Sequence, residues 1–148
     1  MKKTTTLLTL TLLALACCHV SGMIDQTAEE MYPHLKPIEV AKSRRGVMME
    51  WKDKTLRHTV FFEKGVSVTE FFIFNDNRVM STKDFDRLLK PYMKFKVGKR
   101  SVKERWCQVL KPDGSVFAII MWPNIAMGNQ LSIWRGDQPN AAYKQPPN

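Results

Sequence analysis

The hydrophobic positions of this chain follow two patterns, one typical of strands and one typical of a helix. Three segments in the first half are rich in β-branched and aromatic residues and predict strands over 47–51, 56–62 and 66–74. Glu63, Lys64 and Gly65 separate the last two of these segments and predict a tight hairpin.

One segment has the repeat of an amphipathic helix. Its apolar residues lie three, four and seven positions after the first of them, so they share one side of a helix. They are Phe85, Leu88, Leu89 and Tyr92. We expect the helix to begin at Ser81 or Thr82, with the acidic Asp84 in the first turn, where negative charge favours the helix dipole. Pro91 would clash with a preceding carbonyl, so the helix should end or bend near Lys90.

The second half again predicts strands. A Pro112 and Gly114 turn joins the segments 101–110 and 115–122, and the second of these is apolar on both faces, as in a central strand. Residues 131–134 could add an edge strand.

Near its start, the chain shows Thr27 followed by Glu30, the spacing of a capping box. Pro33 and Pro37 prevent one long helix from following, so short helical turns or an extended arm are expected. The element order β-β-β-α-β-β-β predicts an α+β domain, with a twisted antiparallel sheet of five to six strands packed on one main helix.

The first 22 residues resemble a secretory signal. Lys2 and Lys3 precede an apolar run over 7–16, which is too short for the roughly 20 residues that span a bilayer. We expect cleavage before Met23, which gives a signal peptide over 1–22, one domain over 23–138 and a polar, proline-rich tail over 139–148. The alternative is a lipoprotein signal in which Cys17 is lipidated and becomes the N-terminus.

The expected exported form is basic and retains at least one cysteine. Removing residues 1–22 takes away two lysines and no acids, which lowers the formal net charge from +9 to +7. Cys107 is the one cysteine certain to remain, so no intramolecular disulfide is expected and the domain must depend on its core. An extracytoplasmic location, periplasmic or secreted, follows from the signal.

A basic, aromatic stretch is the first candidate for function. Its six cations are accompanied by one acid, Glu104, and they are Lys94, Lys96, Lys99, Arg100, Lys103 and Arg105. Such a density of positive charge attracts anionic polymers or lipid head groups. A second basic group, with Lys42, Arg44 and Arg45, could join it in the fold. The competing interpretation is that these cations form the solvated face of a loop and an edge strand, where they alternate with four buried apolar residues: Phe95, Val97, Val102 and Trp106.

Cys107 is the second candidate. With His58 or His34 it could form a thiolate and imidazolium pair for acyl transfer, and Arg135 could assist. The competing interpretation is that Cys107 is a small buried hydrophobe on a strand.

The sequence predicts no metal site and no cofactor, because the mature chain has two separated histidines, no paired cysteines and no phosphate-binding glycine loop. We therefore expect an exported, non-enzymatic domain that binds a protein or an anionic polymer or lipid of the envelope. One alternative is a cysteine-dependent hydrolase or transpeptidase, and another is a lipid-anchored structural accessory of an envelope or secretion assembly.

Overall fold

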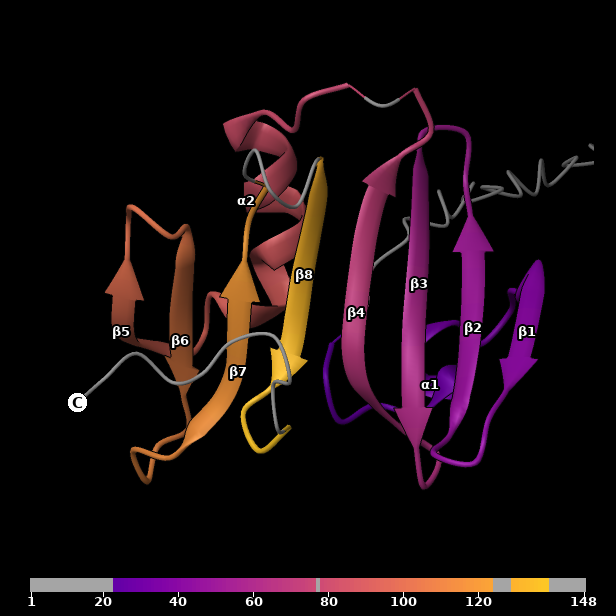
Figure 1. Ribbon diagram of the computed structural model, residues 1–148, viewed down its shortest axis with the longest axis horizontal. Coiled ribbons are helices and arrows are strands. Elements are labelled where there is room, and N and C mark those ends of the chain that lie inside the picture. Colours follow the sequence, from indigo (N-terminus) through magenta and orange to yellow (C-terminus); the bar gives the residue numbers. More distant parts are fainter. Residues whose placement is uncertain (1–22, 77, 124–128, 139–148) are drawn as a thin grey trace, which may run out of the picture.

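The computed structural model describes residues 23–76, 78–123 and 129–138. Within these residues, eight strands form one antiparallel sheet in the order β1-β2-β3-β4-β8-β7-β6-β5 (Figure 1). The strands are β1 (Glu39–Lys42), β2 (Val47–Lys52), β3 (Leu56–Glu63), β4 (Val66–Phe74), β5 (Lys96–Ser101), β6 (Trp106–Leu110), β7 (Val116–Met121) and β8 (Gln130–Arg135).

Two four-stranded meanders build this sheet, one on either side of the helix α2 (Thr82–Leu89) in the sequence. The meanders meet where β4 pairs with β8, for example at Phe72 opposite Leu131. This arrangement leaves β1 and β5 as the two edges of the sheet within the described part of the chain.

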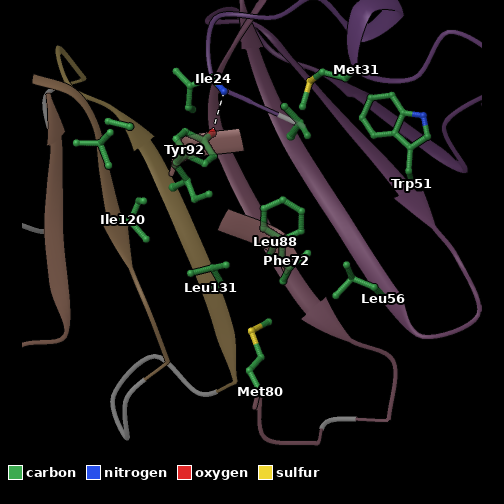
Figure 2. Packing of buried hydrophobic residues seen from close by; sticks show 14 of the residues in the cluster. Ile24, Met31, Trp51, Leu56, Phe72, Met80, Leu88, Tyr92, Ile120 and Leu131 are labelled. Carbon is green, nitrogen blue, oxygen red and sulfur yellow. Dashed lines mark hydrogen bonds between the residues drawn. The ribbon is translucent and has the colours of Figure 1, made fainter. Parts of the chain in front are cut away.

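The helices cover one face of the sheet. The short helix α1 (Ala28–Met31) lies on the side of β2 and β3, while α2 and the 3-10 turn η1 (Lys90–Tyr92) lie on the side of β6 to β8 (Figure 1). Side chains from both meanders and all three helical elements form one apolar cluster, which includes Trp51, Phe72, Leu88 and Leu131 (Figure 2). Burying each such side chain contributes about 1.5–3 kcal/mol, so this cluster is the main source of stability.

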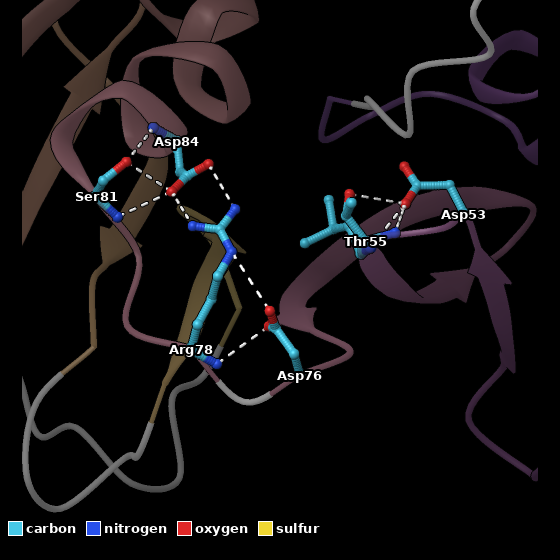
Figure 3. A network of polar contacts seen from close by, with 7 residues as sticks. Asp53, Thr55, Asp76, Arg78, Ser81 and Asp84 are labelled. Carbon is cyan, nitrogen blue, oxygen red and sulfur yellow. Dashed lines mark hydrogen bonds and ion pairs between the residues drawn. The ribbon is translucent and has the colours of Figure 1, made fainter.

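Polar contacts fix the start of α2. The Ser81 hydroxyl accepts from the Asp84 amide at 3.3 Å, and the Asp84 carboxylate accepts from the Ser81 amide at 2.9 Å. Arg78 donates twice to the same carboxylate, at 2.9 and 3.1 Å (Figure 3). Its guanidinium lies 3.6 Å from the ring centroid of Phe74. The hydrogen bonds from Arg78 hold the pKa of Asp84 well below its usual range.

The predicted fold class is wrong in its strand number and in the role of the helix. The sheet has eight strands where five to six were expected, and α2 lies against only one half of it. The strands β1 and β5 escaped prediction because edge strands lack a buried face. β1 is exposed throughout, and Val97 is the only large apolar residue of β5.

Two further strand predictions were wrong, one in its bounds and the other in its place in the sheet. The segment expected as one strand over 101–110 comprises the end of β5, a turn and β6. The strand expected at an edge over 131–134 is β8, which lies inside the sheet between β4 and β7. Its partner β4 is distant in the sequence, and local hydrophobic pattern contains no information about such pairing.

Several local predictions are confirmed. Thr27 and Glu30 form the capping box of α1, and α2 follows Ser81 as its N-cap. The hairpin between β3 and β4 turns through Lys64 and Gly65, both with positive φ, as two-residue hairpin loops prefer. The loop before β7 likewise places Gly114 at φ 84.

Candidate functional site

The basic stretch lies along one edge of the sheet, on β5 and on the residues that flank it (Figure 1). All of its six cations are exposed. We call them the basic edge: Lys94, Lys96, Lys99, Arg100, Lys103 and Arg105. A loop and an edge strand carry these charges, as the competing interpretation expects, but its expectation of buried Val97 and Val102 is wrong, because these side chains are 55% and 78% exposed.

The pairing of β5 sends these cations to both sides of the edge. Lys96 lies opposite Leu110 and Arg100 lies opposite Cys107, with a register shift between them. Leu110 and Cys107 are three residues apart on one strand and therefore face opposite ways, and cross-strand partners share a face. A partner would thus meet Lys96 and Arg100 together only at the edge itself and not on either flat face.

Local packing explains the irregular course of β5. A Cβ on Gly98 would lie 2.8 Å from a methyl carbon of Leu110, so glycine allows β6 to approach closely here. The Lys99 amide donates to the side chain of Gln108 at 3.3 Å. This bulged edge is a poor template for regular strand pairing.

No acidic side chain neutralises the basic edge within the described residues, because none of its cations belongs to an ion pair. The neighbouring acid, Glu104, accepts a hydrogen bond from the Trp106 indole at 2.8 Å. Arg105 donates to the carbonyl of Pro123, and the Lys94 ammonium lies 5.3 Å from the ring centroid of Phe95. The edge therefore presents a net positive field to solvent, with Glu104 as the one acid among its residues.

The second basic group does not join the first. Lys42 ends β1, and Arg44 and Arg45 lie in the turn to β2, at the opposite edge of the sheet. Seven strand spacings separate the two edges, or about 34 Å at the usual spacing of about 4.8 Å. These two basic groups therefore lie apart in the described part of the chain, and the basic edge is the larger.

The structure does not bring the catalytic candidates together. Cys107 lies on β6 and His58 on β3, with three strands between them, or about 19 Å at the usual spacing. Arg135 ends β8, where it pairs with Asp137 at 2.6 Å and with Asp25 at 3.3 Å. His34 is exposed in the segment after α1.

The environment of Cys107 is that of a partly buried strand residue. Burial raises the pKa of its thiol, and the nearby charge of Arg100 opposes this shift only in part. A thiol with a raised pKa carries little thiolate at neutral pH, which makes it a weak nucleophile.

Sequence reasoning missed a buried polar chain beneath the helices. His58 Nε2 lies 3.2 Å from a carboxylate oxygen of Glu70, and the Tyr92 hydroxyl donates to the other oxygen at 3.1 Å. The Tyr32 hydroxyl contacts His58 Nδ1, and the Ile24 amide donates to the Tyr92 hydroxyl at 2.9 Å (Figure 2). Both ring nitrogens of His58 therefore have a polar partner within the core.

This chain of buried polar contacts connects β3, β4 and η1 and offers no access to a solute. His58 and Glu70 are fully buried. Burial, together with the charge of Glu70, holds the pKa of Tyr92 well above its usual value, so this phenol remains a donor. The alternation of His58 with Leu56 and Val60 was the signal that could have placed it in the core.

Other candidate chemistry is limited. Among residues 23–76, 78–123 and 129–138, no three His, Cys, Asp or Glu side chains are grouped to hold a metal ion. No helix in that same part of the chain has the length and apolar character needed to cross a membrane. The predicted signal peptide, with Cys17, and the predicted tail lie outside the described residues.

Comparison with protein-family models, with curated proteins and with solved structures finds no match for this chain.

Proposed function

We propose that this chain is an exported, non-enzymatic domain that binds an anionic macromolecule through the basic edge. The observation that carries this proposal is the placement of six exposed cations on and beside the edge strand β5, none of which belongs to an ion pair within the described structure. Export itself rests on the sequence of residues 1–22.

The geometry favours this binding role over cysteine chemistry. A hydrolase or transpeptidase would need Cys107 and His58 within hydrogen-bond reach of each other, at least in the working complex. Three strands of one continuous sheet separate them, and both ring nitrogens of His58 already have buried partners.

Binding by the basic edge should depend steeply on salt. If four to six cations displace counterions from a dense polyanion, the slope of log affinity against log salt should be about −3 to −5. Each exposed charge alone contributes little to the binding free energy, so affinity should come from the cations of the basic edge acting together.

The test compares two matched triple variants on immobilised heparin. Lys96→Gln, Lys99→Gln and Arg100→Gln remove three charges from the basic edge, whereas Lys42→Gln, Arg44→Gln and Arg45→Gln remove three exposed charges from the opposite edge. We expect the first variant to elute at clearly lower salt and the second to elute close to the wild type.

Because both variants have the same net charge, the comparison separates position from charge. Equal elution of the two variants, or failure of the wild type to bind at low salt, would reject the basic edge as the binding surface. Circular dichroism of both variants checks that the sheet is retained.

A further inference from the structure

Exposed apolar side chains are interleaved with the cations of the basic edge. Met93 is 70% exposed, Val97 is 55% exposed and Val102 is 78% exposed. Met93 precedes Lys94, Val97 follows Lys96, and Val102 precedes Lys103 in the sequence. The edge therefore presents charge and apolar surface together and is not a purely polar rim.

We propose that the anionic partner is a phospholipid bilayer with acidic head groups, which the domain contacts with its β5 edge. This inference rests on the proposed function and names the partner of the same surface. Cations near an anionic membrane surface gain attraction, and apolar side chains gain by entering the boundary between head groups and acyl chains.

The apolar residues favour a bilayer over a soluble polyanion. A polysaccharide or nucleic acid backbone bound to the lysines would leave Met93, Val97 and Val102 largely in water. A membrane interface accepts both types of group, because long lysine side chains extend toward the head groups while neighbouring apolar side chains dip below them. Val97 lies on β5, whereas Met93 precedes the strand and Val102 lies in the turn after it, so they would act as separate contacts along the edge.

The backbone of β5 limits the depth of contact. Its outer side has no strand partner within the described chain, so these amide and carbonyl groups need water or head groups as partners. Unpaired backbone groups are costly in hydrocarbon. The domain should therefore bind peripherally, at the level of the head groups.

The experiment measures flotation with vesicles, in a Cys17→Ser background so that no acyl chain on the protein contributes. The vesicles are neutral phosphatidylcholine or phosphatidylcholine mixed with phosphatidylglycerol. The apolar variant carries Met93→Ser, Val97→Ser and Val102→Ser. The matched control replaces three exposed apolar residues away from the edge with serine: Ile38, Val40 and Val79, which are 61%, 47% and 75% exposed.

We expect binding to the acidic vesicles and little binding to the neutral ones. The apolar variant should lose about tenfold or more in vesicle affinity. A tenfold loss corresponds to removing about two buried methylene groups from the contact. Its elution from heparin should stay unchanged, because its charge is unchanged. The control variant should bind both like the wild type.

The outcomes separate this inference from the proposed function. Binding to heparin without binding to acidic vesicles would overturn the membrane partner and leave the polyanion surface intact. Equal vesicle affinity of the apolar variant and the wild type would also overturn it. Failure to bind heparin and vesicles alike would reject both proposals.

Discussion

Replacing Tyr92 with phenylalanine removes one hydroxyl from the buried polar chain and leaves the ring in place. This hydroxyl accepts from the Ile24 amide at 2.9 Å and donates to the Glu70 carboxylate at 3.1 Å. Ile24 and Glu70 are fully buried, and Tyr92 is 3% exposed, so water cannot easily replace the lost partner. The substitution therefore leaves two buried polar groups with one hydrogen bond fewer each.

The expected cost follows from these two groups. A buried donor without a partner costs about 1–3 kcal/mol, and a hydrogen bond to a charged group contributes about 1.5–3 kcal/mol. Local relaxation reduces the sum, which gives about 2–4 kcal/mol out of a total free energy of unfolding of about 5–15 kcal/mol. With a urea m value of about 2 kcal/mol per molar, the midpoint of unfolding should fall by about 1–2 M.

Urea unfolding followed by tryptophan fluorescence measures this shift. A matched control is Ser115→Ala, which removes a hydroxyl that donates to Asp113 at 2.6 Å on an exposed loop and should cost less than about 0.5 kcal/mol. Hydrogen exchange at the Ile24 amide should also become faster in Tyr92→Phe. A midpoint no lower than that of the control would refute the role assigned to the buried chain.

Two further predictions concern titratable groups. Because the pKa of Asp84 is lowered in the folded chain, its contribution to stability is present above its unfolded pKa of about 3.9 and is lost as pH falls below that value. Asp84→Asn should therefore lower the free energy of unfolding by about 1 kcal/mol near pH 7, and this difference from the wild type should shrink toward pH 2. A difference in urea unfolding that stays constant across this range would contradict the Arg78 contact. The pKa of the Cys107 thiol is raised, so iodoacetamide should label the native chain more slowly than the urea-unfolded chain at pH 7.5, and labelling of the native chain should need a higher pH to become fast. Equally fast labelling of both forms would contradict the partly buried environment.

The sequence predicted those elements whose pattern is local. The stripe of Phe85, Leu88 and Leu89 predicts α2 because helix periodicity appears within a few turns, and Ser81 marks its start with a specific hydrogen bond. The Lys64 and Gly65 turn was predictable for the same reason, since a two-residue hairpin requires positive φ.

What the sequence could not predict depends on distant partners. Val97 alone does not indicate a strand, and β5 exists because β6 provides its hydrogen-bonding partner. The interior place of β8 depends on its pairing with β4, across the whole second meander. The same limit explains why His58 and Tyr92 could not be connected through Glu70 from spacing alone.

The candidate surface was only partly predictable. Six cations over a short span are visible in the sequence, but their location on and beside an edge strand and their separation from Lys42 are properties of the sheet. The exposure of Met93 and Val102 also depends on the fold, because the sequence places similar residues in the core elsewhere.

Lysine acetylation mapped by mass spectrometry tests most directly whether the basic edge is the contact surface. The protein is acetylated briefly, with and without a saturating heparin oligosaccharide, and the modification of each lysine is compared. The account predicts several-fold protection of Lys96, Lys99 and Lys103, with Lys42 and Lys52 unchanged. Uniform protection of all lysines, or protection centred on Lys42, would contradict it.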